Sequence, residues 1–350
     1  MKRLILHIGQ HKTGSKALQS FLDLNREKLA GEGIFYPPGI EQSQVKAYQI
    51  SHYWLYDCLL SRFSRERLEE RLRTLSETSH PTVLLSAEDL FEMTTAHQLD
   101  YSLSLVARAA ELLSTLCRRF ALKTRVVVYL RRQDHSLASH YSQYVRASGH
   151  PQIDFPTFAL ATRWRLDPRP LLKIWGSAFG ESALIVRPYE AARSSPGIVE
   201  DFFELVLGRS LSSRFDKPER TLENVNSSTD RDTLELIRLA HRYGLGRLHD
   251  LLIFSAPRGP GASIHSWLSP AQLQELLAHC RPINEDIARR YLSRAFLYSQ
   301  PESGPNESWK PYSGPTYRSV LTGVLRILSA RVRLLRSSIQ RASQALREYD

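Results

Sequence analysis

The sequence predicts an α/β fold with a mainly parallel central sheet, and three observations lead to this prediction. Four short, nearly continuous apolar runs have the length of strands that are buried on both faces. Amphipathic helical patterns separate these runs, so strand and helix alternate along the chain. The 350 residues are 42% hydrophobic and 24% charged, which is a globular composition. The four expected strands are Arg3–Ile8, Thr82–Ser86, Arg125–Leu130 and Ala183–Arg187.

The expected helices follow from the spacing of their apolar residues. The first, Ala17–Leu29, contains no internal glycine or proline. Between residues 105 and 120, apolar side chains recur every three or four positions, as on the buried side of a helix. Another helix should begin near Asp134, because its carboxylate suits the N-cap position. Three further amphipathic stretches lie at 197–207, 230–243 and 270–298.

One domain is expected over residues 1–300, followed by a linker and a C-terminal helix. Residues 301–315 are rich in Pro, Gly and Ser, which is typical of a linker. From Thr316 onward, seven arginines stand against Glu348 and Asp350, a net charge of +5. Apolar residues at helical spacing interleave with these arginines, so 316–350 is expected to form a basic amphipathic helix. Two interpretations stay open: contact with an acidic membrane surface, or packing on the domain itself or on a second subunit.

The bulk composition restricts the partners and the compartment. A net charge of +11 and a pI of about 9.6 favour anionic partners. Nucleic acid is not expected, because the sequence has no helix-turn-helix, no zinc motif and no basic patch with interleaved aromatics. Three widely spaced cysteines favour a reducing compartment, and no signal peptide or membrane span is expected. We therefore expect a cytoplasmic protein, with peripheral contact at the inner membrane face as an alternative. The oligomeric state is open.

The first strand leads into a glycine-bearing loop, LHIGQHKTGSKALQ (6–19). Gly9 and Gly14 have four residues between them, which is the spacing of a phosphate-binding P-loop. A turn between strand and helix presents main-chain N–H groups and the helix dipole to an anion. The residues after Gly14 are Ser15 and Lys16, however, where a nucleoside triphosphatase has Lys followed by Ser or Thr. The loop carries its other lysine at position 12 instead.

A second anion-binding pattern follows the third expected strand, in VVVYLRRQDHSLASHY (126–141). Arg131 stands at the strand's end and Ser139 lies eight residues later, on the following helix. An arginine and a serine so placed can converge on one phosphate, because the guanidinium forms charge-assisted bidentate bonds.

Together, the two motifs resemble those of bacterial sulfotransferases that use 3′-phosphoadenosine-5′-phosphosulfate (PAPS). HIGQHKTGSKALQ is similar to the family's 5′-phosphosulfate loop, and YLRRQDHSLASHY to its 3′-phosphate motif. GIFYP (33–37), LLSAEDL (84–90) and IVRPYE (185–190) also resemble segments of such proteins, so the resemblance covers roughly residues 3–300. This chain departs from the pattern at Lys16, and at Arg132 and Gln133, which replace an Asp-Pro pair.

The resemblance implies a P-loop NTPase-like three-layer fold and PAPS as the sulfuryl donor, with adenosine 3′,5′-bisphosphate as product and no metal. Lys12 would stabilise the charge that develops on the leaving phosphate oxygen. Arg131 and Ser139 would bind the 3′-phosphate. The 5′-phosphate would be held by the loop and helix start, at Thr13, Gly14, Ser15, Lys16 and Ala17.

A sulfuryl acceptor must lose a proton, so a general base is expected near it. Glu88 is the first candidate, since it follows the strand Thr82–Ser86, and the carboxyl ends of strands face the ligand crevice in α/β sheets. His11 and His52 are further candidates. Aromatic residues around His52 would suit a sugar, so the expected acceptor is a small molecule, a carbohydrate or a glycolipid.

Two other functions remain open from the sequence. A P-loop kinase acting on a small molecule would require ATP and Mg²⁺, and Asp89 is its candidate metal ligand. A non-catalytic nucleotide-binding protein would use the same loop without chemistry. The polar segment ENVNSS (223–228) is a further candidate for nucleotide contact.

Overall fold

The structure is a computed structural model of the whole chain. The structure describes residues 2–39, 49–60, 64–94, 99, 101–147, 151–194, 197–208, 214–216, 230–244, 267–298, 311–325, 328, 329, 332 and 336. The segment ENVNSS and most of the expected linker lie outside the described residues.

Five parallel strands form the central sheet, in the order β2-β3-β1-β4-β5, which confirms the predicted fold class. The strands are β1 (Lys2–His7), β2 (Ile34–Phe35), β3 (Thr82–Ser86), β4 (Leu122–Leu130) and β5 (Leu184–Pro188). Four of them match the expected runs, whereas the short β2 was not predicted. Its two residues are too few to show a hydrophobic period of their own.

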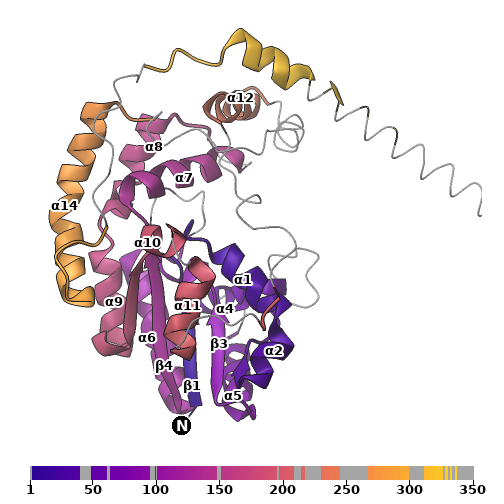
Figure 1. Cartoon of the computed structure of the whole chain (residues 1–350), viewed down its shortest axis with the longest axis vertical. Helices are drawn as coiled ribbons and strands as arrows, with labels where there is room; N and C mark the ends of the chain where they lie inside the picture. The colour runs from indigo at the N-terminus through magenta and orange to yellow at the C-terminus, as the bar shows by residue number, and fades with distance from the viewer. Residues whose placement is uncertain are drawn as a thin grey trace, which may run out of the picture.

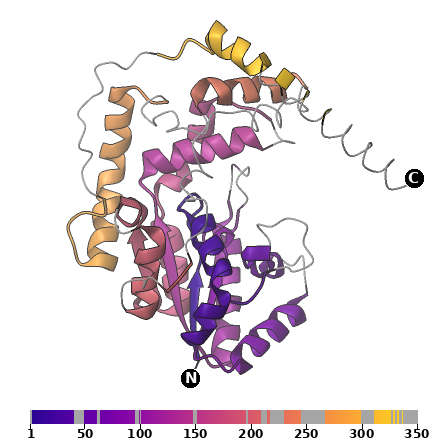
Figure 2. The same cartoon turned by 45° about the vertical axis from the view of Figure 1, so that its right-hand side comes forward.

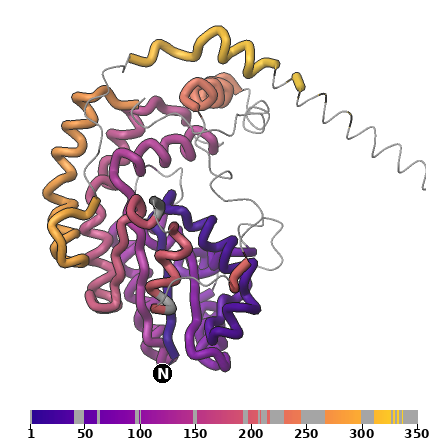
Figure 3. The backbone as a smooth tube through the Cα atoms, in the orientation of Figure 1, coloured from indigo at the N-terminus to yellow at the C-terminus, as the bar shows by residue number. Residues whose placement is uncertain are grey.

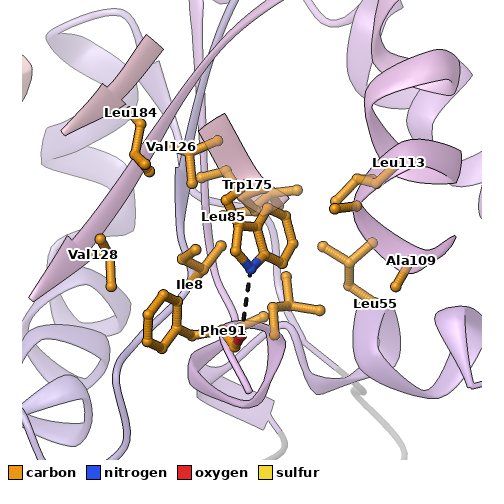
Figure 4. Close-up of a cluster of buried hydrophobic side chains, with 14 of the residues drawn as sticks. Ile8, Leu55, Leu85, Phe91, Ala109, Leu113, Val126, Val128, Trp175 and Leu184 are labelled. Atoms are coloured by element: carbon orange, nitrogen blue, oxygen red, sulfur yellow. Dashed lines mark hydrogen bonds between the residues drawn. The ribbon is translucent and has the colours of Figure 1, made fainter. Parts of the chain in front are cut away.

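Helices cover both faces of the sheet, giving three layers (Figure 1). Successive strand residues point to opposite faces, so Leu4 and Leu6 of β1 join one core cluster while Ile5 joins the other. Trp175 is fully buried in the first cluster and donates its indole N–H to the Phe91 carbonyl at 3.3 Å (Figure 4). The helices packed in that cluster are α4 (Tyr53–Leu59), α5 (Arg65–Glu77), α6 (Leu103–Arg119), α9 (Arg169–Phe179) and α14 (Pro270–Leu292). Those on the opposite face are α1 (Ser15–Leu24), α2 (Arg26–Gly31), α10 (Tyr189–Ser194) and α11 (Ile198–Leu207).

A separate helical cap stands beyond the carboxyl ends of the strands, opposite the N-terminus (Figures 1 and 3). Tyr141, Tyr144, Phe158 and Ile237 are buried in its own hydrophobic cluster. Its helices are α7 (Gln133–Arg146), α8 (Phe155–Ala161) and α12 (Arg231–Arg242). Because the cap stands beyond the carboxyl ends of the strands, it faces the edge of the sheet where both sequence motifs lie.

No described helix has the length and apolarity needed to cross a membrane.

Three helix boundaries differ from expectation, the first being that the helix expected over 270–298 already ends at Leu292. The helix predicted over 17–29 breaks at Asn25, because the Asn25 amide donates to the carbonyls of Phe21 (2.9 Å) and Asp216 (3.0 Å). This side chain ties the first helix to a segment nearly 200 residues away. Asp134 was also wrongly predicted as an N-cap. Helix α7 begins one residue earlier, with Arg132 at the N-cap, and the Asp134 carboxylate accepts from the Arg132 guanidinium.

Gly9 has no room for a side chain. Its φ is +112°, and an added Cβ would lie 2.5 Å from the Glu88 carbonyl oxygen. We expect Gly9→Ala to lower the free energy of unfolding by about 2 kcal/mol or more, through the disfavoured φ and the clash with a main-chain atom. Urea unfolding measures the loss. Gly31→Ala is the matched control, since nothing lies within 4 Å of its Cβ position. An equal effect of both substitutions would contradict the steric argument.

Candidate active site

The two motifs meet because β1 and β4 are neighbouring parallel strands. Main-chain pairing continues past the end of β1: Tyr129 donates to the Gly9 carbonyl (2.8 Å) and Gln10 donates to the Tyr129 carbonyl (3.0 Å). Arg131 then leaves β4 beside the loop, and its guanidinium donates to the Lys12 carbonyl at 2.8 Å. The Arg131 N–H also donates to the Gln10 side chain at 3.3 Å. Residues more than a hundred positions apart thus form one loop cluster.

The glycine loop holds itself in shape. Gly14 is the N-cap of α1 in the left-handed conformation (φ 77°), which a glycine adopts without steric cost. The Thr13 hydroxyl donates to the Gln10 carbonyl at 2.5 Å, and the Ala17 N–H donates to the Gly14 carbonyl at 2.9 Å. These two predicted contact groups are therefore engaged within the loop. Among the described residues, no acceptor bonds the main-chain N–H groups of Gly14, Ser15 and Lys16.

Ser15 gives the clearest indication that the loop binds something. Its side chain is buried, yet its hydroxyl has no hydrogen-bond partner within the described part of the chain. Buried polar groups are nearly always bonded in native proteins, so the hydroxyl is available to a partner from outside the chain, such as water or an anion. The hydroxyl stands beside three unbonded N–H groups at a helix N-terminus, which attracts anions. This donor set fits a phosphate.

Several other cationic side chains lie close enough to Lys12 to affect its pKa. Burial lowers its pKa to about 8; the Glu88 carboxylate opposes this shift, while Lys16, Arg131 and Arg146 add to it. Lys16 itself is exposed on the first turn of α1. An excess of cations around a half-buried lysine favours an anionic ligand, whose charge would offset their repulsion.

Ser139 lies on α7 of the cap, half-buried, and its hydroxyl has no partner among the described residues. Tyr189, at the start of α10, was not singled out from the sequence. The Arg131 guanidinium lies 5.4 Å from the centre of its ring, and an added Cβ on Gly14 would lie 3.2 Å from that ring. Tyr189 thus limits space beside both the arginine and the loop.

Arg132 and Gln133, where the sequence departs from the pattern that it resembles, both make contacts within the protein. The Arg132 guanidinium donates to both Asp134 carboxylate oxygens, at 2.7 and 2.9 Å. The Gln133 amide donates to the Asn284 side chain at 2.7 Å and accepts from it at 3.1 Å, which joins α7 to α14. None of these contacts involves the side chain of Arg131 or Ser139.

Glu88 begins the 3-10 helix η1 (Glu88–Leu90), directly after β3 and on the other side of β1 from β4. Its carboxylate raises the pKa of Lys12, and its main chain packs on Gly9. The structure therefore brings Glu88 and Lys12 to the same edge of the sheet. The carboxyl ends of three adjacent strands supply Glu88, the loop and Arg131.

His11 contacts residues of the segment that follows β3. Its Nε2 donates to the Thr94 carbonyl at 3.1 Å and lies 3.8 Å from an Asp89 carboxylate oxygen. Burial alone would lower the pKa of His11, but the carboxylates of Asp89, Glu92 and Glu88 outweigh it and raise the pKa. A proton-bearing imidazole held by a carboxylate is a poor base. For the Asp89 carboxyl, by contrast, burial itself raises the pKa, to about 6.

His52 has a structural role. It is fully buried, its Nδ1 accepts from the Ser86 N–H at 2.9 Å, and its Nε2 donates to the Pro37 carbonyl at 2.9 Å. Burial lowers its pKa to about 4, so the ring is neutral at pH 7. Because both nitrogens are bonded to main chain, His52 has no lone pair for an acceptor hydroxyl.

Two further residues near Lys12 were missed from the sequence. His140 is buried with both nitrogens unbonded among the described residues, and its ring centre lies 6.0 Å from that of His11. Burial, with the charges of Arg165, His11, Lys12 and Arg131, lowers its pKa well below 6.5. Arg146 adds positive charge near Lys12. Arg146 lies seven residues, or two helical turns, after Ser139, so the sequence could have indicated that both lie on the same side of the helix.

Comparisons with known proteins add little to this geometry. No protein-family model matches the chain, and no curated protein matches it. Among solved structures, it is similar to a sulfotransferase from Alicyclobacillus acidocaldarius, with a TM-score of 0.38 and 13% identity, over 71% of this chain and 96% of that one. A similarity of this size assigns no activity to the chain.

Proposed function

We propose that this protein is a PAPS-dependent sulfotransferase. The observation that carries the proposal is the buried, unbonded Ser15 hydroxyl beside the free N–H groups of Gly14 to Lys16. Arg131, bonded to the Lys12 carbonyl, and Ser139 on α7 supply donors for a second phosphate. A loop for one phosphate and an Arg–Ser pair for another fit a nucleotide phosphorylated at two positions.

In the proposed reaction, an acceptor oxygen or nitrogen attacks the sulfur of PAPS in line with the leaving phosphate. The new bond to sulfur forms as the bond from sulfur to the bridging phosphate oxygen breaks, and the acceptor proton passes to Glu88. The products are the sulfated acceptor and adenosine 3′,5′-bisphosphate. Lys12 stabilises the charge that grows on the bridging oxygen, at a site already rich in cations. His11 and His52 are left out of this scheme because both are bonded elsewhere.

Isothermal titration with adenosine 3′,5′-bisphosphate, AMP and ADP tests the proposal without knowledge of the acceptor. We expect the bisphosphate to bind most tightly. Ser139→Ala should weaken the bisphosphate about tenfold, the effect of one charge-assisted hydrogen bond, and leave AMP unchanged. Tight ADP binding in the presence of Mg²⁺, with no binding of the bisphosphate, would instead indicate the kinase. Binding of the bisphosphate without turnover of PAPS over a panel of sugar, lipid and phenolic acceptors would favour a non-catalytic protein.

The pKa of Lys12 predicts how the bisphosphate affinity depends on pH. An anion binds better to protonated Lys12, whose pKa is about 8 in the free protein. Affinity should therefore be highest near pH 7 and about tenfold lower at pH 9, as the lysine loses its proton. Titrations across this range measure the fall. Lys12→Arg stays charged and is the matched control; a fall of the same size in this variant would assign the titration to another group.

A further inference from the structure

The C-terminal helix presents its apolar side to solvent. Residues 317–325 are helical, and beyond them the structure describes only residues 328, 329, 332 and 336. Figures 1 and 2 place this helix next to α12, at the end of the molecule farthest from the sheet. The exposed apolar side chains are Tyr317 (83%), Val320 (39%), Leu321 (46%), Val324 (47%), Leu325 (54%), Leu328 (53%) and Val332 (47%). They recur every three or four positions, so they share one side.

The opposite side of the helix is the more buried one. Ser319 and Thr322 are half-buried and Gly323 is buried, again at a spacing of three and four residues. A surface helix normally turns its apolar side inward and its small and polar residues outward. Here the arrangement is reversed, which means that packing on the domain does not explain the apolar stripe.

Polar contacts with Asp232 on α12 fix the helix in this orientation. The Asp232 carboxylate accepts from the Tyr312 hydroxyl at 2.8 Å, from the Thr316 N–H at 3.3 Å and from the Ser319 hydroxyl. The Arg231 guanidinium lies between two rings, 4.1 Å from the centre of Tyr312 and 4.6 Å from that of Trp267. The apolar side is therefore held outward by a specific anchor.

The charge of the segment indicates what covers the stripe. From Thr316 to Arg347 the sequence contains seven arginines and no acidic residue. Two copies of residues 316–350 would repel each other, because each has seven arginines against two carboxylates, Glu348 and Asp350, at its end. A bilayer with anionic headgroups complements both properties: it accepts the apolar side chains and attracts the arginines. We propose that segment 316–350 binds the surface of an anionic bilayer, with the side of Leu321, Leu325 and Leu328 inserted.

Vesicle co-sedimentation of the full chain tests this, using phosphatidylcholine vesicles with and without phosphatidylglycerol. We expect binding to the anionic vesicles only. Arg318→Gln with Arg336→Gln should weaken it about 25-fold, at roughly fivefold per arginine. Leu325→Gln with Leu328→Gln should weaken it about tenfold or more. Matched controls are Arg73→Gln on α5 and Leu160→Gln on α8, both exposed outside the segment, which should bind as the unaltered chain does.

Three outcomes would overturn the proposal. The first is equal binding to both kinds of vesicle, and the second is unchanged binding by the double leucine variant. The third is an absence of vesicle binding together with a dimer, seen in sedimentation equilibrium, that this variant dissociates; a second copy would then cover the stripe. Unchanged thermal unfolding midpoints, expected because all four substituted residues are exposed, verify that each variant is folded. The proposal does not rest on sulfuryl transfer.

Discussion

Arg165→Met is expected to destabilise the fold by about 3–5 kcal/mol, because it leaves the Glu92 carboxylate buried without its cation. The two side chains are 3% and 1% exposed, and the Arg165 Nε donates to a Glu92 oxygen at 3.1 Å. Among the described residues, the Glu92 carboxylate would keep two longer hydrogen bonds, from the Gln10 amide at 3.4 Å and from the Thr94 hydroxyl at 3.5 Å. The substitution keeps much of the buried volume, so lost packing contributes little. Urea unfolding at pH 7 measures the difference.

The pH dependence of this loss separates charge from packing. An unpaired buried carboxylate has a folded-state pKa above its unfolded value, so the penalty is complete above the folded pKa and disappears as the group is protonated. The destabilisation should thus shrink from pH 8 towards pH 5, and adding Glu92→Gln should recover part of it. Arg65→Met is the matched control: its partner Glu69 is more exposed, and about 1 kcal/mol or less is expected. A loss that is independent of pH would contradict the charge argument.

Glu88→Gln is expected to lower turnover by about 10²–10⁴-fold, the usual contribution of a general base, while bisphosphate affinity stays within about threefold. The amide keeps the shape of the side chain but cannot accept the acceptor proton. Glu88 also raises the pKa of Lys12, so the substitution should lower that pKa. Affinity must therefore be compared at about pH 6.5, where Lys12 is protonated in either protein. The assay uses the best acceptor found in the panel.

The turnover of His140→Asn should be measured beside that of Glu88→Gln. His140 is neutral at pH 7, and neither of its nitrogens is bonded among the described residues, so it is the strongest rival for the proton. If Glu88→Gln retained full turnover and His140→Asn lost it, the base would be His140. Loss in Glu88→Gln alone supports the scheme above. Equal, small losses in both would place the base elsewhere.

Much of the fold could be predicted because its signals are local. A strand buried on both faces is a continuous apolar run, and β3 was predicted to the residue over Thr82–Ser86. The loop was recognisable because Gly9 and Gly14 fall between a strand and a helix. Local signals failed at Asn25, which ends α1 by bonding to the distant Asp216. They also failed at Asp134, whose carboxylate bonds the nearby Arg132 instead of capping α7.

Some features of the candidate site could likewise be predicted from the sequence, and others could not. The spacing of Arg131 and Ser139, and the lysine at position 12, could be read from the chain because each motif is short and continuous. The roles of the histidines could not, since an imidazole's protonation depends on groups that only folding brings near it. His52 is bonded at both nitrogens, His11 is paired with Asp89, and His140 is buried without a partner among the described residues.

The sequence by itself determined the class of fold, the two anion-binding motifs and the basic, apolar pattern after Thr316. These follow from residue type and period, which need no knowledge of neighbours in space. Only the tertiary structure decided that Glu88, Lys12 and Arg131 share one edge of the sheet, that Arg165 neutralises Glu92, and that Asp232 turns the C-terminal stripe outward. Each of these depends on electrostatic and hydrogen-bond contacts between residues far apart in the chain, whose energies exist only once folding has brought those residues together.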